Sequence, residues 1–171
     1  MMQKKSFAAR SAAMLTAMSL LAACQGSGST AGNQPDAAKA GGDFSDVVKE
    51  RQANFKAISK ANKAAKAAFE GENPAFGDIA TAAATMSANG AKITGHFPAG
   101  SGPESGEKTE ALASIWAKPA EFQQATDKFV TATNTLKAAA DAKNAAGVEA
   151  AIKSVGVTCK ECHKAFREDK K

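Results

Sequence analysis

The sequence contains no tyrosine, a single tryptophan and no run in which β-branched and polar residues alternate. β-Strands are enriched in aromatic and β-branched residues and in alternating apolar and polar positions, so the composition argues against a β-sheet. Alanine and lysine, which are strong helix formers, are abundant instead. We therefore expect an all-α protein.

Aromatic residues interleaved with a basic stripe, the pattern of a nucleic-acid binder, are also missing. The formal net charge of the whole chain is +5. Lys4, Lys5 and Arg10 lie in a segment that we expect to be removed, and no acid leaves with them, so the remainder carries about +2. This balance indicates no nucleic-acid partner.

The N-terminus lacks an apolar run of the roughly 20 residues that a finished transmembrane helix needs. The shorter run SAAMLTAMSLLAA follows a positively charged stretch, which predicts a signal peptide over residues 1–23. It ends in LAAC, which resembles the lipobox of bacterial lipoproteins, in which Cys24 receives lipid and becomes the first mature residue. The alternative is an ordinary signal peptide, with Cys24 left as a free thiol.

These features predict a periplasmic protein held by its lipid anchor on a bacterial membrane, by expectation the outer one. Residues 24–43 are rich in Gly, Ser, Ala and Pro without an apolar period, which predicts a flexible tether. One folded domain then occupies residues 44–171.

Four segments of this domain carry apolar residues at helical spacings, which predicts four amphipathic helices. The first stripe ends at Gly71, and the second opens at Pro74 and fades at Gly95. The inward positions are Phe44, Val48, Arg51, Phe55, Ile58, Asn62, Ala65 and Phe69; Phe76, Ile79, Ala83, Met86, Gly90 and Ile93; Phe122, Thr126, Phe129, Thr133, Leu136 and Ala140; and Val148, Ile152, Val155, Cys159, Cys162 and Phe166.

Between the second and third stripes, a Gly- and Pro-rich stretch predicts a long crossover loop with one or two helical turns around Leu112–Trp116. With short turns elsewhere, the pattern indicates an antiparallel four-helix bundle. A three-helix bundle with one broken helix is the alternative. Many inward positions are Ala, Thr or Gly, which fill a bundle poorly. We expect something other than side chains to occupy part of the core.

The motif CKECH near the C-terminus gathers two of the three cysteines and one of the two histidines. On a helix, Cys159 and Cys162 share a face and His163 lies beside it. Cys-x-x-Cys-His is the attachment pattern of c-type haem, in which two thiols bond the porphyrin and the imidazole reaches the iron. The sequence therefore predicts one covalent haem c on the last helix.

Three other interpretations of the motif fit the sequence less well. A thioredoxin-like motif is expected in a βαβ setting, which this sequence lacks. A structural zinc site needs four ligands, and only His96 and Cys24 remain as candidates. A simple disulfide leaves His163 without a role.

Two further residues agree with haem. Gly156 lies seven residues before His163 on the same strip, where a side chain would collide with a flat macrocycle, although a helical glycine without a role is the alternative. Arg51 is the one charged residue on the first inward stripe, where a haem propionate would pair with it. A snorkelling arginine is the alternative.

A C-terminal haem motif after a four-helix pattern resembles the class II cytochromes c, that is, cytochrome c′ and its low-spin relatives. The resemblance is carried by RQANF, ALASIW, EFQQA and VGVTCKECHKAFR, and so covers nearly everything from Phe44 on.

The resemblance implies haem attachment at Cys159 and Cys162, with His163 as the axial iron ligand. It implies that Arg51 and Gln52 contact the propionates, that Glu110 lies near the haem edge, and that Arg167 borders the proximal face. For Glu110 a solvated loop acid is the alternative. The resemblance also implies a homodimer through the first two helices, and a redox partner protein.

The sixth coordination position distinguishes the functions within this family. In the low-spin relatives a methionine four residues after the arginine completes the coordination, but here that position is Phe55. A phenyl ring cannot ligate, so we expect five-coordinate, high-spin iron with an apolar distal face. Met86 and His96 are the candidate replacement ligands, though core filler and a surface histidine are the simpler interpretations.

The predicted function is binding of nitric oxide, carbon monoxide and other diatomic gases, with nitric oxide buffering or detoxification and electron transfer as roles; no enzyme is expected. The alternatives are a low-spin periplasmic electron carrier and an accessory protein with haem as structural filler.

Overall fold

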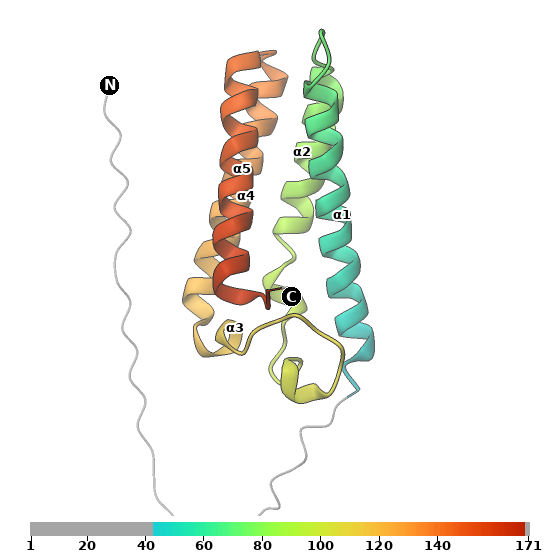
Figure 1. The fold of residues 1–171 in the computed structure, drawn as a ribbon, viewed down its shortest axis with the longest axis vertical. Coiled ribbons are helices and arrows are strands. Elements are labelled where there is room, and N and C mark those ends of the chain that lie inside the picture. The colour runs from blue at the N-terminus through green and yellow to red at the C-terminus, as the bar shows by residue number, and fades with distance from the viewer. Residues whose placement is uncertain (1–42, 170–171) are drawn as a thin grey trace, which may run out of the picture. The chain divides into compact units, whose positions relative to one another are not determined.

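A computed structural model describes residues 43–169 of the chain (Figure 1). The predicted signal peptide, the tether up to residue 42 and the lipidation site Cys24 lie outside the described residues.

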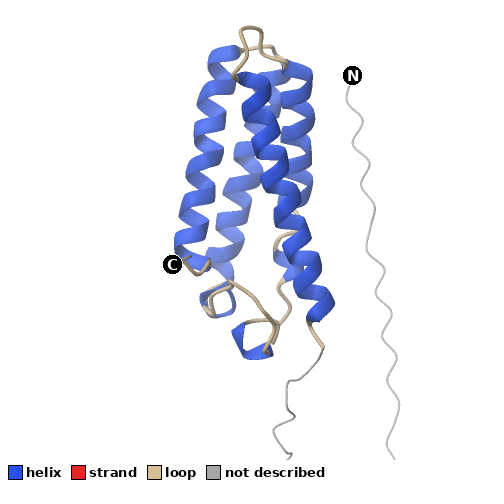
Figure 2. Cartoon of the chain, turned by 45° about the vertical axis from the view of Figure 1, so that its right-hand side comes forward, coloured by secondary structure: helices blue, strands red, loops and turns tan. Residues whose placement is uncertain are grey.

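The described chain is an antiparallel four-helix bundle (Figures 1 and 2), as the sequence predicts, and none of the four long helices is broken. These helices are α1 (Ser45–Phe69), α2 (Phe76–Gly90), α4 (Pro119–Asp141) and α5 (Ala145–Phe166). The crossover between α2 and α4 holds a short α3 (Ser114–Ala117) and two 3₁₀ turns, Thr94–His96 and Pro103–Ser105. Within residues 43–169 there is no strand, only an isolated bridge between Ala111 and Arg167, and no helix is long and apolar enough to span a membrane.

The helix ends follow local chemistry. Pro119 is the first residue of α4, where a missing backbone N–H costs nothing. The side chain of Asn144 caps α5 by accepting a hydrogen bond from the Gly147 amide at 3.0 Å. The turn before it places Lys143 at φ 52°, an uncommon conformation for a residue other than glycine.

The second helix stops at Gly90, earlier than the predicted fade at Gly95. The Asn89 carbonyl accepts from the Asn54 side chain at 3.0 Å and from the Lys92 amide at 3.2 Å, and Ile93 donates to Gly90 instead of Asn89. The chain therefore turns out of the α-helix, and Ile93 still reaches the core from this turn.

Three of the four seams between neighbouring helices are closely packed: α1 with α2, α2 with α4, and α4 with α5. At the α2–α4 seam a Cβ on Gly90 would come within 2.9 Å of the Phe129 ring, so this crossing requires glycine. By contrast, α1 and α5 make very few contacts with each other.

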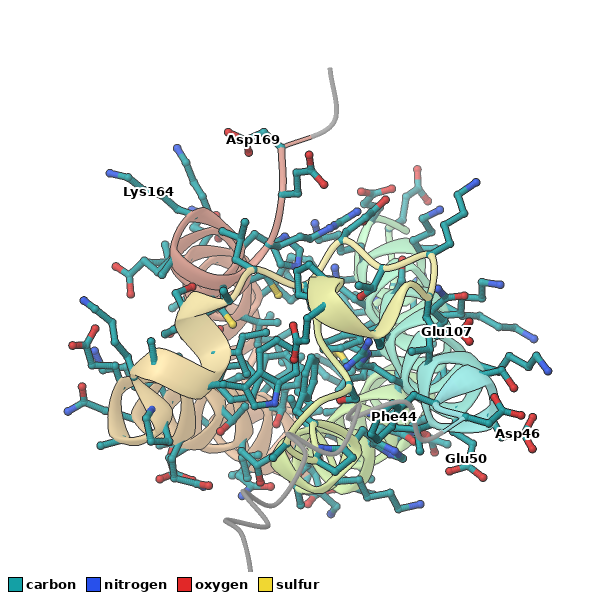
Figure 3. The ribbon with its side chains drawn as sticks, turned by 90° about the horizontal axis from the view of Figure 1, so that it is seen from below. Phe44, Asp46, Glu50, Glu107, Lys164 and Asp169 are labelled. Atoms are coloured by element: carbon teal, nitrogen blue, oxygen red, sulfur yellow. The ribbon has the colours of Figure 1, made fainter. Side chains whose placement is uncertain are left out.

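The crossover loop covers one end of the bundle, which we term the loop end (Figure 3). Trp116 anchors it, because its indole N–H lies 3.1 Å from the Phe97 carbonyl and 3.0 Å from the Pro98 carbonyl. The opposite end, the aliphatic end, is filled by small and aliphatic side chains such as Ala65, Leu136 and Val148, which are at most 1% exposed.

Candidate functional site

The CKECH motif lies in the last three turns of α5. Cys159 and Cys162 are half-buried free thiols packed against the hydrophobic core, whereas His163 is exposed. Burial and the neighbouring Cys159 raise the pKa of the Cys162 thiol to about 11. Both thiols lie against the hydrophobic core, while charged side chains such as Lys128 and Glu161 line the outer surface beside Cys162.

Two ionic groups adjoin the histidine. Partial burial, and to a lesser extent the Arg167 guanidinium, lower the pKa of His163, while the Glu110 carboxylate acts in the opposite sense. Because the neutral imidazole is the form that binds iron, this environment favours the ligand state.

Arg51 enters the bundle from α1 and is only 3% exposed. Its guanidinium donates to the Ser101 carbonyl at 3.1 Å and to Thr109 Oγ1 at 3.0 Å, and lies 4.5 Å from the centre of the Phe97 ring. Within residues 43–169 no carboxylate forms an ion pair with it. Burial lowers the pKa of Arg51, because desolvation disfavours the charged guanidinium. An anion beside the guanidinium would offset this cost by forming a charged hydrogen bond with it.

The other two predicted residues of α1 flank this arginine. Gln52 is exposed, and its amide donates to the Lys108 carbonyl of the crossover loop at 3.0 Å. Phe55 is half-buried, and its ring meets Phe97 edge-on with centroids 6.4 Å apart. Phe55 thus presents only carbon atoms to the interior beside Arg51.

A row of aromatic rings connects the α1 residues with α5. Phe97 packs edge-on against Phe122 at 5.0 Å, and Phe122 packs edge-on against Phe166 at 5.1 Å. Phe166 follows His163 by three residues on α5. The α1 side and the α5 side of the predicted site are therefore brought to the same, loop end of the bundle.

Glu110 and Arg167 form an ion pair, in which the guanidinium Nε donates to the carboxylate at 2.7 Å. Around them the loop pairs with the end of α5: the Leu112 amide donates to the Phe166 carbonyl at 3.1 Å, and the Glu168 amide to the Glu110 carbonyl at 2.8 Å. Ser114 Oγ adds a hydrogen bond to the Ala165 carbonyl at 2.7 Å. These bonds satisfy terminal carbonyls of α5 and fix both charged groups near His163.

The residues present fit a flat macrocycle between α1 and α5. A Cβ on Gly156 would meet no atom within 4 Å, so no packing within the described protein requires glycine there. The two helices that carry the predicted site are the pair with few mutual contacts. The buried Arg51 supplies a cation for which the described residues offer no acid. A haem bonded to Cys159 and Cys162 would use all three features.

The candidate replacement ligands lie elsewhere. Met86 is fully buried in α2 as part of the hydrophobic core. His96 is half-buried in the 3₁₀ turn that follows α2. Among residues 43–169, no three His, Cys, Asp or Glu side chains are grouped to hold a metal ion.

Sequence reasoning missed the residues of the loop that surround Arg51. Ser101 is fully buried and its hydroxyl lies 3.4 Å from the guanidinium, while Phe97 lies beneath it. The closely spaced glycines of Gly100–Gly102 are the feature of the sequence that could have indicated this loop. Gly100 adopts φ +84°, and a Cβ on Gly102 would clash with Trp116 at 2.8 Å, as expected where a loop folds tightly over a buried group.

Residues 46–167 match the cytochrome c′ family. Cytochrome c′ from Pararhodospirillum photometricum is 34% identical over 121 residues, which make up 71% of this chain and 95% of that protein. The crystal structure of cytochrome c′ from Rubrivivax gelatinosus is similar with a TM-score of 0.65 and 30% identity, covering 72% of this chain and 96% of that one.

A third similar structure carries a ligand. It is the nitric oxide complex of a cytochrome c′ variant from Alcaligenes xylosoxidans, with a TM-score of 0.65 and 28% identity, covering 73% of this chain and 95% of that one.

Proposed function

The chain belongs to the cytochrome c′ family, whose members carry one covalently bound haem c, and on this premise we propose that it is a gas-binding haem protein. The family consists of haem proteins for electron transfer or gas binding, not of classical enzymes. We propose in addition that His163 is the axial ligand of a five-coordinate, high-spin iron that takes up nitric oxide or carbon monoxide.

The motif residues attach the group. The thiols of Cys159 and Cys162 would each hold the porphyrin by adding across a vinyl group, sulfur to one carbon and hydrogen to the other, which needs no outside oxidant or reductant. The neutral imidazole of His163 would supply a nitrogen ligand to the iron. Bound in this way, the haem supplies an iron that accepts diatomic ligands.

Polar residues at the loop end orient the group. Arg51 is proposed to pair with a propionate, because it is buried among neutral acceptors, and Gln52 lies one residue further on the same helix. Glu110 holds Arg167 by an ion pair beside His163, which fits the implied position of Arg167 at the proximal face.

The observation that carries the proposal is Phe55. Its half-buried ring stands beside Arg51 and against Phe97, where the low-spin pattern of the resemblance requires methionine. Carbon atoms cannot ligate iron, so a haem held by His163 would keep a coordination position for an outside ligand. That the similar cytochrome c′ from Alcaligenes xylosoxidans was solved with nitric oxide supports the same ligand here.

The proposed role is buffering or removal of nitric oxide, with electron transfer to a redox partner, in the periplasm. The protein would stand on the membrane through a lipid at Cys24, as the lipobox resemblance implies.

An optical and electron paramagnetic resonance spectrum of the haem-loaded chain tests the proposal. We expect a high-spin ferric signal and a spectrum that changes when nitric oxide is added to the ferrous form. A low-spin spectrum with a sulfur-to-iron band would contradict it and identify Met86 as a ligand of an electron carrier. High-spin iron that binds no diatomic would indicate that haem is structural filler.

A variant pair tests the role of Phe55 directly. Phe55→Ala is expected to open the distal side and to raise the association rate of carbon monoxide, measured by flash photolysis. Phe69→Ala removes the same ring from the far end of α1 and serves as the control, with an expected rate close to wild type. Equal rates in both variants would show that Phe55 does not restrict access.

A further inference from the structure

The face of α1 turned away from the core carries a row of lysines. Lys49, Lys56, Lys60 and Lys63 are exposed and follow at intervals of seven, four and three residues, so they share one side of the helix. From first to last they extend about 21 Å along α1. We term this row the lysine stripe.

Few acids offset the stripe. α1 has no acid between Arg51 and Phe69, and its Asp46 and Glu50 lie near the start of the helix (Figure 3). Lys49 pairs with Asp46 at 3.2 Å, but among the described residues no carboxylate pairs with the other three lysines. The neighbouring α2 carries one charged residue, Asp78.

The stripe is a local concentration of charge. Basic and acidic residues are equal in number over residues 43–169. An anionic surface would therefore be attracted to this face of the bundle specifically and not to the protein as a whole.

We propose that the lysine stripe docks the bundle onto an anionic phospholipid surface. A straight row of flexible cations along one helix suits a planar layer of headgroups, and each lysine near such a surface strengthens binding about fivefold. The inference takes the proposed lipid at Cys24 as part of its argument. The tether predicted over residues 24–43 would, as a flexible coil, have a root-mean-square length of about 25 Å between the lipid and the start of α1.

Two other occupants fit the stripe less well. A second copy paired stripe to stripe would place lysines against lysines, which is unfavourable, so the homodimer that the resemblance implies through the first two helices would pair through another side of α1. An acidic redox protein would gain most by binding near the α1–α5 seam, where the site residues Phe55 and Cys159 lie, but the stripe faces away from the core.

The test uses the haem-loaded chain from Asp43 to Lys171, without Cys24. The matched segment makes up 95% of the Pararhodospirillum photometricum protein, so it folds as a whole protein there. Sedimentation with vesicles measures binding to phosphatidylcholine with and without phosphatidylglycerol. The triple variant Lys56→Gln, Lys60→Gln, Lys63→Gln is compared with Lys128→Gln, Lys137→Gln, Lys153→Gln, which loses the same charge from α4 and α5.

We expect salt-sensitive binding only to vesicles with phosphatidylglycerol, a loss of about 100-fold in the stripe variant and a loss of less than about tenfold in the control. Equal losses in both variants, or no binding by the wild type, would overturn the proposal. So would crosslinks in the full chain on its membrane that join Lys60 to another protein or to a second copy.

Two further measurements distinguish a failure of this proposal from a failure of the proposed lipidation or of the proposed gas binding. The mass of the Cys24 peptide reports lipidation independently, since the vesicle experiment uses a chain without Cys24. Gas binding is measured on the same variants and is expected to be unchanged, because no stripe lysine belongs to the haem site.

Discussion

The two ends of the bundle are built differently. At the aliphatic end, residues such as Ala65, Leu136 and Val148 close a core from protein atoms alone. At the loop end, aromatic rings and a buried cation meet, and the helices α1 and α5 make little contact. From this difference we expect the aliphatic end to contribute most to the stability of the fold, and the loop end to be completed by the haem that the proposed function places there.

The largest expected effect separates attachment from folding. Replacing Cys159 and Cys162 together by serine is expected to abolish covalent haem, because no thiol remains to form a thioether. Haem staining on a denaturing gel measures the loss, and far-ultraviolet circular dichroism shows whether the helices persist. Covalent haem retained in this variant would contradict the assignment.

A substitution at the aliphatic end is expected to change the stability of the fold and not the haem. Leu136 is 1% exposed, and Leu136→Ala should lower the free energy of unfolding by about 2–5 kcal/mol through lost burial and a cavity. Urea unfolding measures this. The haem spectrum is expected to stay that of wild type, and a changed spectrum would show that the two ends are not independent.

Arg51 tests the comparison further, because its contribution to the free energy of unfolding should depend on whether haem is bound. In the haem-loaded chain Arg51→Met is expected to cost about 2–3 kcal/mol, since a propionate loses its charged partner. In the haem-free chain the cost should be close to zero, because the arginine has only neutral acceptors against its desolvation. Urea unfolding of both forms gives the difference, and Arg167→Met, at a partly exposed ion pair, is the control. Equal costs in both forms would refute the propionate assignment.

Two glycines make the smallest and most local test. Gly90→Ala should destabilise both forms by about 1–3 kcal/mol, because its Cβ meets Phe129 at 2.9 Å. Gly156→Ala should stabilise the haem-free chain by up to about 1 kcal/mol, since its Cβ meets nothing. With haem bound the same change is expected to destabilise. Thermal unfolding of each variant with and without haem, compared with wild type, measures these effects. If Gly156→Ala stabilised both forms, Gly156 would not belong to the haem site.

Much of the fold could be predicted from the sequence because helical spacing and breakers act locally. The stripes at Phe122 and Leu136 are buried as expected, and Gly71 and Pro74 separate the first two helices. The early end of α2 could not be predicted, because it depends on the Asn54 side chain of another helix taking the Asn89 carbonyl.

The site divides in the same way. Cys159, Cys162 and His163 form a contiguous motif whose chemistry is local. The surroundings of Arg51 depend on where Phe97 and Ser101 fall after the loop folds back, which no spacing encodes. The ion pair of Glu110 with Arg167 likewise joins residues far apart in the chain. The lipid anchor, the haem attachment points and the spin state remain predictions.

The small number of contacts between α1 and α5 also affects where a haem could be accommodated. Within residues 43–169, the hairpins α1–α2 and α4–α5 are joined chiefly through α2 and α4. Opening the edge between α1 and α5 breaks few native contacts, so this local fluctuation costs less free energy than opening any other seam. A haem held between α1 and α5 would therefore displace fewer contacts between protein groups than a haem held at any other seam.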